Sequence, residues 1–383
     1  MTDPSIDEHF VRRALELARQ GIGLASPNPY VGAVIVDRLG KIAGTGVYTY
    51  EGVKHAEVRA LEEAGDKARG ATLYINLEPH AHQGRTPPCT DALIAAGIRR
   101  VVACMADPNP KVAGRGFEQL RAAGIHVEVG RLEAEARRLD EGFARYIRHG
   151  VPLVTLKSAM TLDAKIAAAP AAASKPDVGT PAGGWITAEE ARAHVQLQRH
   201  QSDAILVGIG TILADDPLLT DRSGRPRRRP LLRVILDSHL RLPLDARLVR
   251  SSADDVLVFC GSSEKKKYEL VARGVRVEQA ASAPSDSGLL DIHAVLRRLG
   301  ELEITSLMIE GGSTVNGTAL AGGAVDKVFF YFAPRIMGDD NAVAFASGSA
   351  FQETNRMLRV NQIQLHRFGE DMAVEGYLRD PYA

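Results

Sequence analysis

Short apolar runs alternate with helical patterns along almost the whole chain, and this alternation constrains the fold more than any other feature of the sequence. The run VGAVIVD at residues 31–37 predicts a buried strand, whereas residues 55–64 carry apolar positions at helical spacing. Strands that alternate with short helices favour a parallel or mixed sheet covered by helices on both faces. The sequence therefore predicts an α/β protein.

The alternation runs in two series that meet near Gly150. Because 383 residues exceed the size of one ordinary domain, we expect two domains, residues 1–150 and 151–383. Further helices are predicted at residues 89–96 and 115–123. Further strands are predicted at residues 72–77, 100–105, 125–129, 152–160, 204–208, 233–237, 256–260, 306–312 and 327–334.

Two capping boxes predict where helices begin. Ser5 with Glu8 precedes the first helical pattern, and Thr187 with Glu190 precedes a helix expected to extend to Arg199. Residues 167–184 are instead rich in Ala, Pro and Gly, and residues 281–288 have a similar composition. We expect irregular structure in both segments. The first of these segments is predicted to be a mobile loop or an insertion.

Net charge, the length of apolar runs and the number of cysteines together exclude several classes of protein. Lys and Arg total 47 and Asp and Glu total 47, so the chain as a whole offers no attraction to nucleic acid or to acidic membranes. No run approaches the roughly 18 apolar residues of a membrane span. Three cysteines are too few for a disulfide scaffold. We therefore expect a cytoplasmic protein with no nucleic-acid or membrane partner.

The first series carries a combination of residues that suits a metal-dependent deaminase. His55 and Glu57 begin a predicted helix, His80 follows the next strand, and Cys89 begins the next helix. A zinc deaminase needs His and Cys ligands from two such turns and an unligated Glu nearby to move protons. An isolated His-x-Glu is common, but the ordered combination is more specific. At a helix N-terminus, Cys89 is also expected to be favoured as a thiolate.

The second series carries two glycine-containing turns after predicted strands. Glu310-Gly311-Gly312-Ser313-Thr314 precedes a helix, and Gly208-Ile209-Gly210-Thr211 follows another strand. Glycine lets a backbone approach a phosphate, and open α/β sheets bind ligands at the carboxyl ends of their strands. A tight structural turn explains either motif equally well, so the residues alone leave both interpretations open.

A family resemblance covers nearly the whole chain. The segments PNPYVGAVIV, HAEVRAL and LEPHAHQGRTPPCTDALIAAG closely resemble the deaminase half of the bifunctional riboflavin-biosynthesis deaminase/reductase family. The segments LKSAMTLDAKIA, WITAEEAR, TILADDPLLT, RVILDS and EGGSTVNG continue the match into its reductase half. The arrangement of both halves in this order makes the resemblance specific.

The resemblance implies a fold and two reactions. The fold would be a cytidine-deaminase-like α/β/α sandwich followed by a dihydrofolate-reductase-like α/β domain. The reactions would be zinc-dependent hydrolytic deamination of a phosphoribosylated diaminopyrimidinone and then NADPH-dependent reduction of its ribosyl group to ribityl. The implied cofactors are Zn²⁺ and NADPH, and we expect a homodimer acting on a small phosphorylated substrate.

The resemblance also implies site residues in this chain. The zinc ligands would be His55, His80 and Cys89, with Glu57 as the proton shuttle. The pyrimidine would meet Asn28 and His82, and the ribose phosphate would meet Arg199, Leu219, Arg222 and Glu310. The nicotinamide cofactor would meet Met160, Trp185, Thr211, Asp215, Ser238, Gly312, Ser313, Thr314, Val315, Asn316, Gly317 and Thr318.

The chain departs from the family pattern at the metal. His80 stands where the family usually has Cys, so two neutral imidazoles and one thiolate would leave the zinc site with a formal charge of about +1. A more acidic water and a weaker hydroxide nucleophile are then expected. The deaminase is expected to work, and a slow or metal-altered deaminase and a structural remnant are the alternatives. If the zinc site were a structural remnant, the chain would be a reductase with an idle deaminase half.

The reductase half departs from the pattern as well. Asp163-Ala164-Lys165 replaces the usual Asp-Gly-Lys, and Gly183-Gly184-Trp185 replaces Ser-x-Trp. Lys157 and Asp163 are candidates for orienting the sugar or relaying a proton, and a strand-end ion pair between them is the alternative. A nucleic-acid base deaminase and a zinc-stabilised scaffold are the remaining readings, and the 5% aromatic content disfavours the first.

Overall fold

The computed structural model describes residues 4–82, 87–169, 184–261, 265–283, 288–347 and 357–383. Contacts divide the chain into two compact units. The first comprises residues 1–149, 226–229 and Tyr382, and the second comprises residues 150–225, 230–381 and Ala383. Each unit has its own sheet and its own core.

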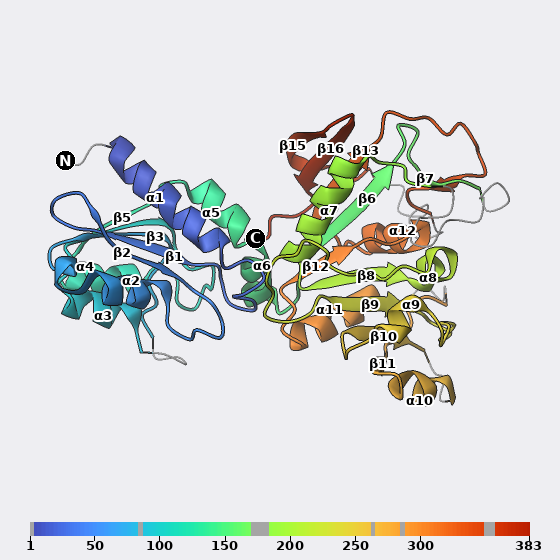
Figure 1. Ribbon diagram of the computed structural model, residues 1–383, viewed down its shortest axis with the longest axis horizontal. Helices are drawn as coiled ribbons and strands as arrows, with labels where there is room; N and C mark the ends of the chain where they lie inside the picture. The colour runs from blue at the N-terminus through green and yellow to red at the C-terminus, as the bar shows by residue number, and fades with distance from the viewer. Residues whose placement is uncertain (1–3, 83–86, 170–183, 262–264, 284–287, 348–356) are drawn as a thin grey trace. The chain divides into compact units, whose positions relative to one another are not determined.

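The first unit is a five-stranded mixed sheet between two layers of helices. The strand order is β2-β1-β3-β4-β5, in which β1 is antiparallel to both neighbours and β3, β4 and β5 are parallel. Helices α1 and α5 cover one face, and α2, α3 and α4 cover the other (Figure 1). The elements are α1 (Pro4–Arg19), β1 (Gly32–Val36), β2 (Ile42–Val47), α2 (Ala56–Ala64), a 3₁₀ helix (Gly65–Ala68), β3 (Thr72–Leu77), α3 (Cys89–Ala95), β4 (Arg100–Met105), α4 (Arg115–Ala122), β5 (His126–Val129), α5 (Glu133–Leu139) and α6 (Glu141–His149).

Helix α2 lies unusually close to strand β2, and two glycines make this approach possible. A Cβ atom at Gly44 would lie 2.1 Å from the Ala60 carbonyl oxygen, and one at Gly46 would lie 1.9 Å from that of Ala56. Neither position therefore accepts a side chain without a shift of the helix. The first turn of α2 is in this way fixed against the sheet, which fixes the residues that begin it.

The second unit is built on a nine-stranded sheet in the order β11-β10-β9-β8-β12-β6-β13-β16-β15. The strands from β11 to β13 are parallel, and β16 and β15 extend the sheet as an antiparallel hairpin. The elements are β6 (Leu153–Met160), β7 (Lys165–Ala167), α7 (Glu189–Gln201), β8 (Ala204–Gly208), α8 (Ile209–Asp215), β9 (Leu232–Leu236), α9 (Arg247–Arg250), β10 (Val256–Cys260), α10 (Lys265–Val271), β11 (Val275–Gln279), α11 (Ile292–Glu301), β12 (Ser306–Ile309), α12 (Ser313–Ala321), β13 (Lys327–Phe332), β14 (Val343–Ala344), β15 (Asn361–Phe368) and β16 (Asp371–Tyr377).

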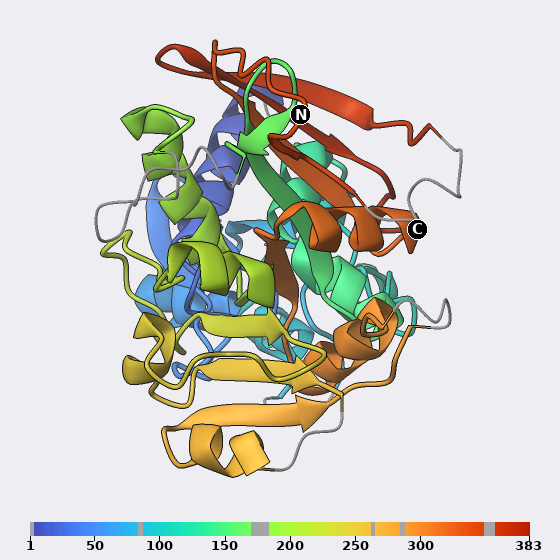
Figure 2. The ribbon, with the colours of Figure 1, turned by 90° about the vertical axis from the view of Figure 1, so that its right-hand side faces the viewer.

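Helices cover both faces of the large sheet. Val328 packs with α11 and α12, whereas the next residue, Phe329, packs with α7 on the opposite face, as expected for alternating side chains. Figure 2 shows α7 (yellow-green) and α12 (orange) on opposite sides of the strands. Because β6, β8, β9 and β12 are parallel, their carboxyl ends meet at one edge of the sheet.

The predicted strands and helices are confirmed, with four differences. The first capping box is wrong, because α1 already begins at Pro4 and Ser5 lies inside the helix. The second capping box is wrong, because α7 has Ala188 as its N-cap without a side-chain bond, and the Thr187 carbonyl instead accepts a bond from Arg192. The polar segment before Gly150 forms α5 and α6, and the strands β2, β7, β11, β14, β15 and β16 had no prediction. Of the two irregular segments, residues 170–183 and 284–287 lie outside the described residues.

No helix among the described residues is long and apolar enough to cross a membrane.

Candidate functional site

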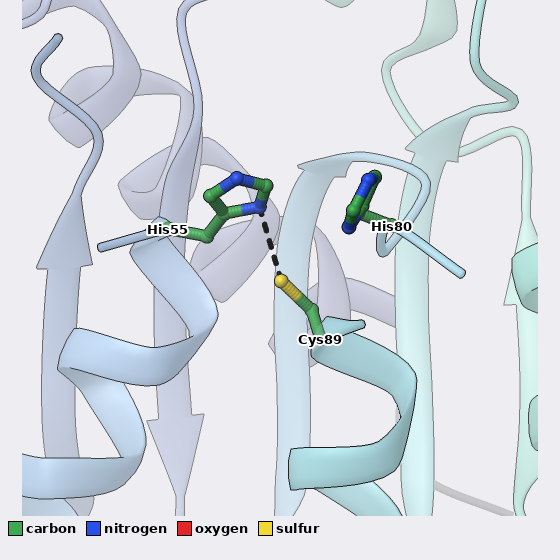
Figure 3. A group of neighbouring side chains, drawn as sticks. All are labelled: His55, His80 and Cys89. Carbon is green, nitrogen blue, oxygen red and sulfur yellow. Dashed lines mark hydrogen bonds between the residues drawn. The ribbon is translucent and has the colours of Figure 1, made fainter. Parts of the chain in front are cut away.

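The metal-binding candidates of the first unit come together at the ends of three elements. His55 is the N-cap residue of α2, and its side chain makes no capping bond. Its Nδ1 atom instead lies 3.1 Å from the sulfur of Cys89, the first residue of α3. His80 follows β3, and the ligand atoms of the three residues all lie within 4.8 Å of one another (Figure 3).

Backbone hydrogen bonds hold two of these ligands in register. The carbonyl of His80 accepts bonds from the N–H groups of Cys89, at 2.8 Å, and Thr90, at 3.2 Å. The turn after β3 is thereby tied to the start of α3. The backbone positions of His80 and Cys89 relative to each other are consequently set by the main chain.

The side chains present fit a zinc ion. Nδ1 of His80 is buried and has no hydrogen-bond partner among the described residues. Burial, and then the neighbouring His82 and His55, lower the pKa of His80 to about 4, so the ring is neutral at neutral pH. Neutral imidazole is the form that binds metals, and a nitrogen, nitrogen and sulfur set leaves a fourth position for water or substrate.

The expectation that the helix N-terminus favours the Cys89 thiolate is wrong. Burial raises the pKa of the thiol well above its usual value, and the adjacent Glu57 carboxylate raises it further. A divalent cation, by its own charge, would release this proton.

Glu57 occupies the first turn of α2 and is only 3% exposed. Its Oε2 atom has no hydrogen-bond partner in the described part of the chain. Burial raises the pKa of this carboxyl, although His55 and Cys89 act in the opposite direction. A carboxyl with a raised pKa next to the ligand cluster is suited to accept and return a proton.

The two predicted pyrimidine contacts flank the ligand cluster. The side-chain amide of Asn28 donates to the hydroxyl of Tyr48 at 2.5 Å, and the Tyr48 ring meets the His55 ring edge-on at 5.5 Å. The His82 ring lies 4.0 Å from that of His80. His82 thus contacts the candidate ligand His80 directly, and Asn28 is linked to His55 through Tyr48. Sequence reasoning missed Tyr48, because a lone tyrosine after a strand carries no motif.

A buried polar network fixes the segment that carries Asn28. Asn76 accepts a bond from the N–H of Gly32 at 2.9 Å and donates to the carbonyl of Tyr30 at 2.8 Å. The carboxyl of Asp140 accepts from the N–H of Tyr30 at 2.7 Å. Both side chains are fully buried. The chain just after Asn28 is therefore held at Tyr30 and at Gly32. Neither Asn76 nor Asp140 carried a signal in the sequence.

Glu78 fixes the other side of the cluster. Its carboxylate accepts backbone bonds from Gly116 at 2.7 Å, Gly114 at 2.8 Å and Asp107 at 2.9 Å. A side chain at Gly116 would lie 2.1 Å from the Pro79 carbonyl oxygen, so this loop packs directly on the chain before His80. Glu78 consequently anchors the end of β3 immediately before the ligand.

The phosphate and sugar candidates of the second unit centre on a buried ion pair. Arg199 on α7 donates to both carboxylate oxygens of Glu310, at 2.7 and 3.0 Å, and to the carbonyl of Thr220 at 2.9 Å. Lys157 on β6 lies 3.6 Å from the same carboxylate. Burial opposes the charge, but Arg199 and Lys157 outweigh it and lower the pKa of Glu310 to about 2.

Leu219 and Arg222 lie in the loop that follows α8. Leu219 is buried and has a φ of 55°, in the left-handed region. Arg222 is exposed, and its N–H donates to the side chain of Gln196 at 3.0 Å. The two predicted phosphate ligands therefore differ, since the guanidinium of Arg199 is committed to Glu310 and Thr220 whereas that of Arg222 faces solvent.

The start of α12 fits a nicotinamide dinucleotide. Gly312 is the N-cap residue, and the Ser313 hydroxyl and the Asn316 Oδ1 atom are buried without hydrogen-bond partners in the described residues. The Asn316 amide donates to the carbonyl of Phe345 at 2.8 Å, which orients its other end. The backbone N–H groups of this helix end and the Ser313 hydroxyl can donate to an anion, whereas the Asn316 Oδ1 atom can only accept a bond from a donor of the cofactor.

The remaining cofactor candidates surround the same edge of the sheet or support it. Met160 ends β6 and is 2% exposed, Thr211 lies in α8, and the carbonyl of Ser238 accepts a bond from Gly261. A side chain at Gly317 would lie 2.0 Å from the Ser347 carbonyl oxygen, so that position packs against protein. The other predicted residues of these two helices are Asp215, Thr314, Val315 and Thr318.

Trp185 and Asp163 make contacts that the sequence did not indicate. The Trp185 ring is 43% exposed, and the guanidinium of Arg192 lies 5.0 Å from its centre. Asp163 accepts bonds from the N–H groups of Met337, at 3.1 Å, and Gly338, at 2.9 Å. The alternative of a Lys157–Asp163 ion pair is wrong, because Lys157 pairs with Glu310.

Comparisons with known proteins connect both sites to one family. A family model described as the RibD C-terminal domain matches residues 152–374. A second, described as the cytidine and deoxycytidylate deaminase zinc-binding region, matches residues 4–105.

Relatives and solved structures match over almost the full length. The riboflavin biosynthesis protein RibD of Aquifex aeolicus is 40% identical over 369 residues, covering 96% of this chain and 98% of that protein. RibD of Escherichia coli is 41% identical over 345 residues, covering 87% and 89%. The structure of Acinetobacter baumannii RibD superposes with a TM-score of 0.83 at 35% identity, covering 98% and 99% of the two chains.

A Thermotoga maritima structure carries a title that names two reactions. It is described as a diaminohydroxyphosphoribosylaminopyrimidine deaminase/5-amino-6-(5-phosphoribosylamino)uracil reductase, and it superposes with a TM-score of 0.78 at 36% identity. It covers 97% of this chain and 99% of its own. The fold-class prediction is confirmed, with a deaminase-like first unit and a reductase-like second unit.

Proposed function

Since this chain belongs to the RibD family of riboflavin-biosynthesis proteins, we propose the residues by which it carries out the family's two reactions. The chain is a bifunctional deaminase and reductase with a zinc-binding deaminase half and an NADPH-using reductase half. Its substrate is a small phosphorylated pyrimidine. We assign deamination to residues 1–150 and reduction to residues 151–383. The family membership disfavours both a nucleic-acid base deaminase and a reductase without a deaminase.

The proposed deaminase site uses His55, His80 and Cys89 to hold zinc. The ion would supply Lewis-acid chemistry that makes a water acidic enough to attack at neutral pH. Glu57 accepts the proton of the attacking water and returns it to the leaving amine. The observation that carries this assignment is the meeting of three potential ligand atoms beside the buried Oε2 of Glu57, which has no partner among the residues that the structure describes.

Asn28 and His82 orient the pyrimidine in this proposal. Asn28 is held by Tyr48 and by the network of Asn76 and Asp140, so its side chain meets a substrate without rearrangement. Preorganised hydrogen-bonding groups need no reordering in the transition state. Asn28 and His82 would hold the reacting carbon of the pyrimidine near the attacking water and Glu57.

The proposed reductase site lies at the carboxyl ends of β6, β8, β9 and β12. NADPH would supply a hydride to the ribosyl carbon, and the residues around the start of α12 would hold the cofactor's phosphates. Arg222 contacts the substrate phosphate, and Glu310 with Lys157 faces the sugar hydroxyls. Arg199 keeps Glu310 charged, as the lowered pKa of that carboxyl indicates.

We also propose that the chain works as a homodimer in the cytoplasm. All three cysteines are buried and none is joined in a disulfide, which is the usual pattern of proteins in reducing compartments.

A two-stage assay tests the proposed function. Wild-type protein is expected to release ammonia from the diaminopyrimidinone and, separately, to oxidise NADPH only with the deaminated product. His80→Cys is expected to retain zinc and at least to match the wild-type rate of ammonia release, because thiolate is an equally competent zinc ligand. NADPH oxidation without any ammonia release would leave a reductase alone, and loss of zinc from His80→Cys would show a turn built for imidazole.

A further inference from the structure

One face of helix α7 holds three consecutive residues of the loop that carries the proposed phosphate ligand. The side chain of Gln196 accepts the N–H of Arg222 at 3.0 Å, and Arg199 donates to the carbonyl of Thr220 at 2.9 Å. Between them, Nδ1 of His200 lies 3.1 Å from the carboxylate of Asp221. Arg199 and His200 lie three and four positions after Gln196, so all three side chains lie on the same side of the helix.

The loop requires such anchors. Leu219 has a φ of 55°, which is unfavourable for a residue with a side chain. The other carboxylate oxygen of Asp221 accepts the N–H of Ser223 at 2.9 Å, so this one side chain holds the loop on both sides of Arg222. The side chains of His200 and Asp221 are only 4% and 6% exposed.

The His200–Asp221 pair also keeps the Asp221 carboxylate away from the guanidinium of Arg222. Asp221 is next to Arg222 in sequence, and a carboxylate there could pair with the guanidinium or repel a phosphate. His200 instead draws that carboxylate toward α7, away from solvent. Arg222 remains exposed, whereas the guanidinium of Arg199 is committed to Glu310 and Thr220.

We propose that His200, through Asp221, is a positioning residue that presents Arg222 to the phosphate of the substrate and so sets the preference for a phosphorylated substrate. This inference rests on the proposed reductase function and on the phosphate role of Arg222. His200 itself contacts neither substrate nor cofactor. Its effect should therefore fall on binding of the phosphate alone.

The test compares His200→Leu with wild type in NADPH oxidation, using the deaminated substrate with and without its phosphate. The KM for the phosphorylated substrate is expected to rise about tenfold, because the arginine is no longer held in place. The kcat, the KM for NADPH and the kcat/KM for the dephosphorylated substrate are expected to stay within about twofold. His200→Asn, whose amide can still reach Asp221, should restore the wild-type KM.

Two further variants keep the test decisive. Asp221→Ala is expected to give the same selective rise in KM should His200→Leu fail to fold. His293→Leu, which removes a histidine of the same unit whose ring contacts the Gly322 carbonyl, should change nothing. An equal loss with both substrates, or an unchanged KM, would overturn the inference. Failure of the wild-type protein to reduce the phosphorylated substrate would instead refute the proposed function.

Discussion

Replacing Glu57 by glutamine is expected to slow ammonia release about a thousandfold, because a positioned general acid and base contributes on the order of 10²–10⁴ in rate. Glutamine has the same shape but cannot accept the proton of the attacking water. The side chain is almost fully buried and its Oε2 atom has no partner among the described residues, so nothing nearby replaces it. The measurement is the rate of ammonia release at saturating substrate.

Two observations accompany this result. Zinc content and NADPH oxidation with the deaminated substrate should match wild type, since Glu57 is not one of the proposed ligands. Glu62→Gln is the matched control, because Glu62 lies on the same helix but pairs with Lys54 at the surface. A Glu57→Gln protein that kept most of its ammonia release would remove Glu57 from the mechanism.

The second large effect is expected for Arg199→Met. Within the described ranges, this change leaves the buried carboxylate of Glu310 with only Lys157, 3.6 Å away, for compensation. Breaking a buried pair in this way costs about 3–5 kcal/mol of unfolding free energy. Reductase activity should fall at least about a hundredfold, since both the charge and the place of Glu310 depend on Arg199. Denaturant unfolding and NADPH oxidation measure the two effects.

The pH dependence of this loss has a definite sign. The pKa of Glu310 is lowered to about 2 in the folded chain, so its pairing stabilises the protein above the ordinary carboxyl pKa. That stabilisation is lost as the pH falls through the lowered value. The difference in stability between wild type and Arg199→Met should therefore shrink in acid.

Two control variants identify the cause. Arg199→Met combined with Glu310→Gln should be more stable than Arg199→Met alone, because no buried carboxylate is left without its arginine. Arg298→Met breaks a more exposed pair with Glu278 and should change stability by no more than about 1 kcal/mol. Equal losses for Arg199→Met and Arg298→Met would contradict the importance of burial at Glu310.

The fold was predictable where elements repeat a strong pattern. The apolar runs of the parallel strands other than β11 could be read directly, because a strand buried on both faces is apolar throughout. Strand β11 (VRVEQ) alternates apolar and polar residues and had no prediction. The hairpin of β15 and β16 could not, because β15 (NQIQLHRF) lies at the edge of the sheet and is largely exposed. Strand β2 (IAGTGV) was missed because its glycines, which admit α2, lower its strand propensity.

The metal cluster was predictable because its members start helices or follow a strand in a recognisable order. Strand β3 separates His55 from His80 and Cys89 in sequence, yet the strand-helix alternation brings such positions to one edge of the sheet. The residues that hold the cluster in place were not predictable. Asn76, Asp140 and Glu78 act through backbone partners more than 25 positions away, which only the packed fold brings together.

Metal content is the most direct test of the zinc site. Purified protein should contain about one zinc per chain, and a chelator should abolish ammonia release, with zinc restoring it as one equivalent is added back. NADPH oxidation with the deaminated substrate should continue throughout. A chain stripped of every divalent metal that still releases ammonia at the full rate would contradict the account.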